Sequence, residues 1–358
     1  MSDRGFTLVE SLVAVALTLT VTGAVFALVN PDSDVAQAQP EAMDMQQRAR
    51  VASDLLSRDL LMAGAGLTIG PGRGALTHAF APVIPRRLGL VGADPSDLAR
   101  RDAVTIAYVS PAAAETTLRA PAAAGASALE LSDVPACPAG REACGFEAGM
   151  NALVFDGAGR FDFFAVTGVE DWTLQVRHLG QAGGSAYEDG ASVVQAELHT
   201  YYFNSVTRQL RHADGYLSDV PVIDNVVDAA FDYFGSPSPP SAPMPPPGTA
   251  NCLYDEGRNL TTDLEPLPPQ GGSLAALPLS ILSDGPWCGQ GGTRFDADLL
   301  RVKKIRVMFR VQASRAFLRG AGADFLVPGT SRSALRALPD YTLTFEITPR
   351  NLSLGRWS

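Results

Sequence analysis

The sequence predicts an α+β protein in which one long N-terminal helix packs on an antiparallel β-sheet, with a small β-sandwich or barrel inserted. Three observations lead to this prediction. An uncharged apolar run, Ser11 to Val29, comes first. A helical apolar stripe follows it up to residue 66, and from Ala103 onward the hydrophobic period changes to two. The chain of 358 residues is long enough for two or three packed units.

The apolar run has the length of a membrane span. Leu12 to Val29 would extend about 27 Å as a helix, which is close to one bilayer core. A cleaved signal peptide would have a more basic start than Arg4 alone and a small-residue cleavage site, whereas this run ends in VNPDSD. We therefore expect a retained transmembrane helix over residues 6–30, single-pass, with the N-terminus cytoplasmic and the acidic bulk of the chain outside.

Glu10 stands at the start of this run. An unpaired carboxylate in hydrocarbon is costly, so Glu10 needs a partner. We find no partner for it nearby on the same helix.

A second, amphipathic helical half is expected over residues 31–66. Pro31 should break or kink the helix between the halves, because proline lacks a backbone donor and clashes with the preceding turn. Gly64 and Gly66 should end the helix. The apolar stripe consists of Ala49, Ala52, Leu56, Leu60 and Ala63, and is widened by Val51, Leu55 and Met62. Residues 67–100 form a Gly/Pro-rich connector, which follows a helix rather than a strand and so is not a phosphate-binding loop.

Two sets of strands follow the connector. The inserted β domain is expected over residues 101–197, with strands at 104–109, 128–131, 152–155, 161–166 and 172–176 and a hairpin turn at 156–160. The second set, residues 198–358, has strands at 198–204, 209–212, 226–234, 302–311 and 341–347. We expect this second set to form the sheet that the amphipathic helix covers.

A proline-rich loop, residues 236–298, interrupts the second set. Its first part, SPSPPSAPMPPP, has seven prolines in twelve residues and excludes a packed element. Long loops of this kind are often functional, but a variable surface decoration is an equal alternative.

Four cysteines fit an oxidising compartment. Their spacing does not match zinc knuckles, so we expect two disulfides. Of the three possible connectivities we expect Cys137 with Cys144 and Cys252 with Cys288.

The sequence contains no catalytic or metal-binding motif that we would assign. His199 and His212 could face each other across adjacent strands, which we interpret as a satisfied surface pair rather than two metal ligands. Asp296 and Asp298 lack the ligand spacing and the glycine of a calcium loop. We therefore expect no enzyme activity, no cofactor and no metal.

Charge argues against a nucleic-acid partner. The formal net charge is −10, whereas phosphate binding needs clustered basic residues. Arg301 to Arg310 is locally basic, but its charges alternate with apolar residues and indicate the solvated face of a strand.

The segment RGFTLVESLVAVAL resembles the N-terminus of a type IV prepilin or a type II secretion pseudopilin. The matching features are a short leader over residues 1–5 that ends in Gly5, then Phe6, then Glu10 five places into the mature chain, then an apolar helix. In that family a prepilin peptidase cuts after the glycine and methylates the new amino terminus, which implies a cut between Gly5 and Phe6. The long helix on a pilin-like sheet, the segment RARVASDLLSRDLLMAGAG and the extra β unit resemble PilW-type minor pilins.

This resemblance implies assembly rather than catalysis. A minor pilin would wait in the inner membrane, lose its leader and join an initiation or tip complex for type IV pilus assembly, at the pilus base or tip. Its partners would be other minor and major pilins through the N-terminal helix, prepilin peptidase and inner-membrane lipid. Glu10 would set the register by pairing with the Phe6 amine of its own chain or a neighbour.

Two alternatives remain open at this point. One is a minor pseudopilin of a type II secretion system, which would have the same start. The other is a membrane-tethered periplasmic enzyme or binding protein.

Overall fold

The computed structural model describes residues 7–66, 74–157, 159–179, 184–260, 264–269, 272–332 and 337–353. The chain divides into two compact units. The first consists of Met1–Ala49 with Val311–Tyr341, and the second of Arg50–Arg310 with Thr342–Ser358. One long helix and several antiparallel sheets, one of them a half-closed barrel, confirm the predicted α+β class.

Helix α1, Leu8–Met62, is a single element of 55 residues. The sequence predicted a break or a kink at Pro31, and the break is wrong, because the helix continues through this residue and through Pro40. A proline inside a helix removes one backbone donor and crowds one preceding turn. A long helix keeps its other backbone hydrogen bonds on both sides, so it can bend without ending.

The first unit holds the N-terminal part of α1 and a loop segment with the 3₁₀ helix η5, Ala316–Leu318. Glu41 on α1 accepts a hydrogen bond from the backbone N–H of Ser314. Arg48 forms an ion pair with Asp44 at 2.9 Å, one helical turn earlier. The contact between Glu41 and Ser314 thus attaches this loop to the helix, whereas the pair of Arg48 and Asp44 lies within the helix.

The second unit contains a five-stranded sheet in the order β1-β2-β9-β10-β11. The strands are β1 Val83–Ile84, β2 Ala103–Tyr108, β9 Glu197–Asn204, β10 Gln209–Ala213 and β11 Asp219–Asp224. We had placed β2 in the inserted domain, but its residues pair with β9 from Ala103 opposite Tyr202 to Tyr108 opposite Glu197. Strand pairing depends on partners far away in the sequence, so periodicity alone did not assign β2 to its sheet.

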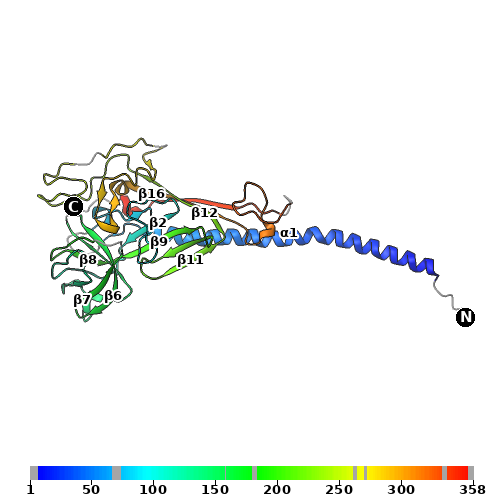
Figure 1. Ribbon diagram of the computed structural model, residues 1–358, viewed down its shortest axis with the longest axis horizontal. Helices are drawn as coiled ribbons and strands as arrows, with labels where there is room; N and C mark the ends of the chain where they lie inside the picture. The colour runs from blue at the N-terminus through cyan, green and yellow to red at the C-terminus, as the bar shows by residue number, and fades with distance from the viewer. Residues whose placement is uncertain are drawn as a thin grey trace. The chain divides into compact units, whose positions relative to one another are not determined.

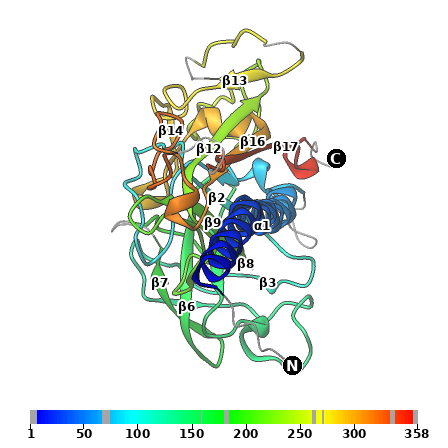
Figure 2. The same ribbon diagram turned by 90° about the vertical axis from the view of Figure 1, so that its right-hand side faces the viewer.

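The last turns of α1 pack on this sheet, whereas the sequence predicted that the helix would cover a sheet formed by the second strand set alone. The backbone N–H of Gly64 donates to the carbonyl of Ala107 on β2 at 3.0 Å. Figures 1 and 2 both show the C-terminal part of α1, which belongs to the second unit, beside β2 and β9. The central stripe of the helix is fully buried, whereas the predicted flanking residues Val51 and Leu55 are 46% and 41% exposed. The apolar stripe is therefore narrower than the sequence suggested.

The inserted domain is a six-stranded antiparallel sheet in the order β3-β8-β5-β6-β7-β4. Backbone hydrogen bonds from Ser132 to Thr117 at 2.9 Å and from Arg119 to Glu130 at 2.8 Å join its two edges, so the sheet curls into a small half-closed barrel. The hairpin turn between β5 and β6 lies where it was predicted. The strands are β3 Glu115–Thr117, β4 Ala128–Glu130, β5 Asn151–Phe155, β6 Phe161–Glu170, β7 Thr173–His178 and β8 Ser192–Gln195.

A separate four-stranded sheet has the order β13-β12-β16-β17. Its strands are β12 Val226–Gly235, β13 Ala275–Leu277, β16 Val302–Val311 and β17 Tyr341–Ile347. The predicted alternation holds in β16, where Ile305, Val307 and Phe309 are buried. The predicted second strand set is thus divided between two sheets, because β9 and β10 belong to the five-stranded sheet.

Short elements complete the described chain. Strands β14, Trp287–Cys288, and β15, Phe295–Asp296, form a small ladder. The other 3₁₀ segments are η1 Leu76–His78, η2 Glu142–Gly145, η3 Gly291–Thr293, η4 Ala297–Arg301 and η6 Arg350–Ser353.

Candidate functional site

The first candidate site is the N-terminal part of α1. Leu8–Ala27 is long and apolar enough to cross a membrane, and this window is 0% buried. Its large side chains are exposed on all sides of the helix, for example Leu12 at 60%, Leu19 at 68% and Phe26 at 70%. A helix that is apolar all round is stable only where lipid or other helices cover it.

Glu10 has a hydrogen-bonding partner in Thr7, the residue just before its own helix, although the sequence indicated no partner nearby. Oε2 of Glu10 accepts hydrogen bonds from the backbone N–H of Thr7 at 3.0 Å and from its hydroxyl at 2.9 Å. The backbone N–H of Glu10 points back to Thr7 Oγ1 at 3.3 Å. Thr7 precedes the first helical residue, so Thr-Leu-Val-Glu is a capping box. The sequence signal was present, but it was missed because the helix start had been placed at residue 6.

The capping box holds the Glu10 carboxylate against the first turn of α1. The unpaired N–H groups of a helix N-terminus carry partial positive charge, which favours a carboxylate there. The Glu10 carboxylate therefore points toward the N-terminus of the helix and not outward from its side. The predicted processing residues, Gly5 and Phe6, lie outside the described residues.

Two hydroxyl groups in the apolar segment form hydrogen bonds within the helix. Thr18 Oγ1 donates to the carbonyl of Ala14 at 2.7 Å, and Thr20 Oγ1 donates to the carbonyl of Ala16 at 2.8 Å. Such internal bonds reduce the cost of placing threonine in hydrocarbon. These two residues are therefore compatible with a membrane environment.

Both predicted disulfides are present. Cys137 is bonded to Cys144, seven residues away, and Cys252 is bonded to Cys288, thirty-six residues away. The second bond links the first part of the proline-rich loop to strand β14, which lies near the end of the same loop. The loop is held further by Asn251, whose side chain donates to the carbonyl of Pro243 at 2.8 Å.

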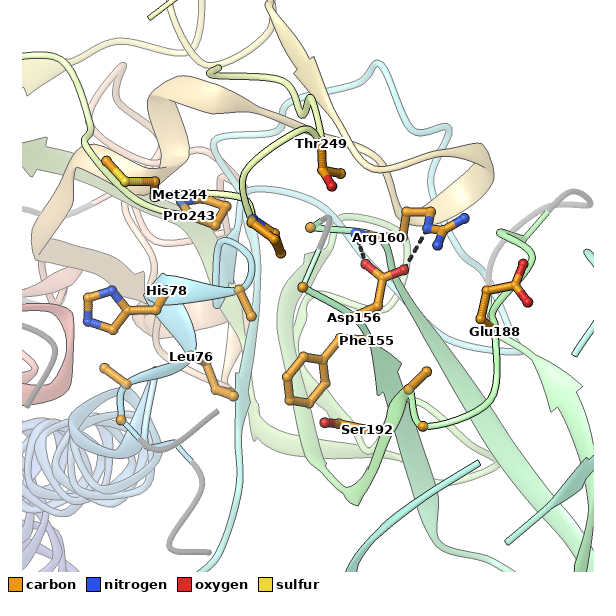
Figure 3. Close-up of a pocket in the computed structure, with 18 of the residues that line it drawn as sticks. Leu76, His78, Phe155, Asp156, Arg160, Glu188, Ser192, Pro243, Met244 and Thr249 are labelled. Atoms are coloured by element: carbon orange, nitrogen blue, oxygen red, sulfur yellow. Dashed lines mark hydrogen bonds and ion pairs between the residues drawn. The ribbon is translucent and has the colours of Figure 1, made fainter. Parts of the chain in front are cut away.

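A groove of 480 Å³ lies in the second unit between this loop and the barrel. Figure 3 shows Met244 from the loop on one side and Phe155 from β5 on another. The charge of Arg160 in the wall is matched by Asp156, with Nε and Oδ2 2.6 Å apart. The groove residues come from several separate segments, and no sequence motif marked them.

A second polar cluster joins α1 to the five-stranded sheet. His199 on β9 and His212 on β10 face each other, with Nδ1 and Nε2 2.8 Å apart. Asp59 on α1 lies with Oδ2 3.3 Å from the same Nδ1 of His199. The predicted contact between the two histidines is therefore confirmed, but it is a half-buried contact below the helix rather than a surface pair. Burial lowers the pKa of both imidazoles, more than the nearby carboxylate raises them.

The aspartates that we had considered for calcium have other partners. Asp296 accepts hydrogen bonds from the backbone N–H groups of Asp298 at 2.8 Å and Gly285 at 2.5 Å. Asp298 forms a buried ion pair with Arg301. These contacts cap η4 and attach it to the neighbouring loop, which is a structural role.

The basic residues of β16 are also engaged. Lys304 and Arg306 both contact Glu346 on β17, at 2.8 and 2.7 Å. Lys303 donates to the carbonyl of Leu352. These pairs fit the interpretation of the basic stripe as one polar face of a sheet.

Comparison with known proteins adds one finding. Residues 1–26 match the family model described as the prokaryotic N-terminal methylation motif. No curated protein and no solved structure matches the chain. The motif, together with the exposed apolar helix, supports a type IV pilin-like or pseudopilin protein with a membrane-anchoring N-terminal segment.

Proposed function

We propose that this chain is a minor pilin that joins a membrane-embedded initiation or tip complex for type IV pilus assembly. The observation that carries the proposal is the apolar segment Leu8–Ala27, which overlaps the methylation motif at residues 1–26 and is 0% buried among the residues that the structure describes. Side chains of this kind are stable in lipid before assembly and against other helices afterwards. The role is therefore lateral packing of helices, and it needs no catalytic residues.

Processing would place a charge next to Glu10. Cleavage between Gly5 and Phe6 leaves an amine one residue before Thr7, which already contacts the Glu10 carboxylate. In a low-dielectric environment a carboxylate and an ammonium group attract strongly, and either charge alone is penalised. We infer that Glu10 pairs with the Phe6 amine of its own chain or of a neighbour and sets the register between helices.

The proposed location follows from the same helix. The N-terminus would lie in the cytoplasm and the folded units in the periplasm, with the single helix crossing the inner membrane before assembly. Two disulfides suit the periplasm, because they persist in oxidising compartments. The barrel and the proline-rich loop make the chain larger than a helix with one sheet, which suits a PilW-type subunit at the tip, where bulk does not obstruct the next subunit.

The test is a strain deleted for this gene and complemented with the intact gene, with Glu10→Ala or with Glu10→Gln. We expect the deletion to lose sheared surface pili, the intact gene to restore them, and both variants to fail. Glu10→Gln keeps an oxygen that can accept from Thr7 but removes the charge, so it separates register pairing from helix capping. Immunoblots of the membrane fraction control for abundance, and mass spectrometry of the mature chain controls for cleavage before Phe6.

Two outcomes would contradict the proposal. Normal pili in the deletion strain, with loss of type II secreted proteins from the medium, would favour the pseudopilin. An uncleaved chain, with pili and secretion both normal, would favour a membrane-tethered periplasmic enzyme or binding protein.

A further inference from the structure

We propose that Asp59, His199 and His212 bind one divalent transition-metal ion, for which Zn²⁺ is the best match. The proposal does not depend on the pilin assignment. One ligand atom from each of the three residues lies within 4.8 Å of the other two, and all three residues belong to the second unit. Two imidazole nitrogens and one carboxylate oxygen form a donor set that zinc uses in proteins, with a fourth position left for water.

The distances between the donor atoms are close to those of a tetrahedral site. Bonds of about 2.0–2.1 Å at tetrahedral angles place ligand atoms about 3.3 Å apart. His199 Nδ1 and Asp59 Oδ2 already have this separation, at 3.3 Å. His199 Nδ1 and His212 Nε2 are 2.8 Å apart. Binding of an ion would therefore increase the distance between these two nitrogen atoms by about half an ångström, and small side-chain rotations can provide this movement.

Two tyrosines orient the proposed ligands. Tyr108 Oη lies 3.2 Å from Nε2 of His199, the ring nitrogen that faces away from the cluster. If His199 donates Nε2–H to this oxygen, its Nδ1 lone pair is free for the metal. Tyr201 Oη donates to Asp59 Oδ2 at 2.6 Å. In metal sites, residues that form hydrogen bonds to the metal ligands fix the orientation of each ligand and the tautomer of each histidine.

Without metal, the two imidazoles share one N–H···N hydrogen bond. Binding requires that His212 carries its proton on Nδ1 instead of Nε2, a tautomeric change with no net loss of a proton.

The ion would connect three elements. Asp59 lies on α1, His199 on β9 and His212 on β10. Their side chains are half-buried, which leaves room for an entering ion and a water ligand. A bound metal would therefore fasten the end of the helix to two adjacent strands and stabilise their packing.

The test uses the full-length chain in detergent, purified without a polyhistidine tag, stripped with EDTA and titrated with Zn²⁺ in a calorimeter. We expect one Zn²⁺ per chain with a Kd below about 1 µM. His199→Gln, His212→Gln and Asp59→Asn should each weaken binding at least about 100-fold, since loss of a direct ligand exceeds the 10–100-fold effect of an outer partner. A Co²⁺ titration should give the visible absorption of a tetrahedral site in the wild type only.

His178→Gln is the matched control. This histidine is also half-buried and contacts a carboxylate, with Nε2 2.8 Å from Asp162 Oδ1, but it is not part of the cluster. Its variant should bind Zn²⁺ as the wild type does. Absence of binding by the wild-type chain, or equal binding by all three ligand variants, overturns the proposal. If a ligand variant misfolds, the decisive result is the wild type itself, whose melting temperature must rise with Zn²⁺ and fall again with EDTA.

Discussion

Replacing Leu56 by alanine tests how α1 is attached to the five-stranded sheet. Leu56 is 0% exposed, so the substitution removes a fully buried side chain. Burial of a leucine side chain contributes about 1.5–3 kcal/mol, and the cavity left behind adds to this loss. Leu→Ala changes in rigid cores cost about 2.7–5 kcal/mol, so we expect the free energy of unfolding to fall by about 3 kcal/mol.

Leu55→Ala is the matched control on the adjacent residue. Leu55 is 41% exposed, and its replacement leaves no closed cavity. Its cost should be about 1 kcal/mol or less, partly offset by the higher helix propensity of alanine. The two variants have the same composition, so a difference between their free energies of unfolding shows which of the two side chains is buried against the sheet.

The assay is urea unfolding of the full-length chain in detergent, followed by near-ultraviolet circular dichroism. This signal reports on packed tyrosines such as Tyr108 and Tyr201 on the sheet, whereas far-ultraviolet signal would be dominated by helix that persists in the micelle. We expect the free energy of unfolding of Leu56→Ala to be about 2 kcal/mol lower than that of Leu55→Ala. Equal losses for the two variants would refute the docking of this helix face.

The remaining predictions concern the loop and the histidines. The double variant Cys252→Ala/Cys288→Ala should lower the free energy of unfolding by about 3.8 kcal/mol, because the bond closes a separation of 36 residues and so reduces the entropy of the unfolded chain. Denaturant titration measures this loss. A loss below about 1 kcal/mol would contradict the prediction. For His199 and His212, burial lowers the folded pKa below the unfolded value of 6.5, so the unfolded chain binds more protons at mildly acidic pH. Stability should therefore be full above about pH 6.5 and decrease as the pH falls below it, and His212→Gln should flatten this pH dependence.

Local patterns predicted the longer strands but missed several short ones, such as β3, β8 and β13. The strands at 152–155 and 161–166 and the hairpin turn between them lie where they were expected, because strand period and turn chemistry act within a few residues. The pairing of Cys137 with Cys144 was predictable for the same reason, since a bond across seven residues has few competitors. Of the break or kink predicted at Pro31, the break is wrong, because one missing hydrogen bond does not outweigh the rest of a long helix.

The candidate sites were predictable to different degrees. Glu10 was found from its position in an apolar run, but its contact with Thr7 was missed because the contact depends on where the helix starts. The histidine contact was anticipated from strand adjacency. The third member of that cluster, Asp59, could not be anticipated from the sequence. It lies on the helix, 140 residues before His199, and only the packing of α1 on β9 brings it close to the histidines.

By itself, the amino-acid sequence determined the apolar N-terminal segment, the carboxylate at its start, the amphipathic stripe and the disulfide pairs. These follow from composition, from short-range spacing and from period, which are properties of neighbouring residues. The tertiary structure alone decided that β2 pairs with β9, that the second strand set forms two sheets, and that Asp59 meets two histidines. Each of these depends on segments that are distant in sequence, and their choice of partner is determined by total burial and hydrogen bonding across the whole chain.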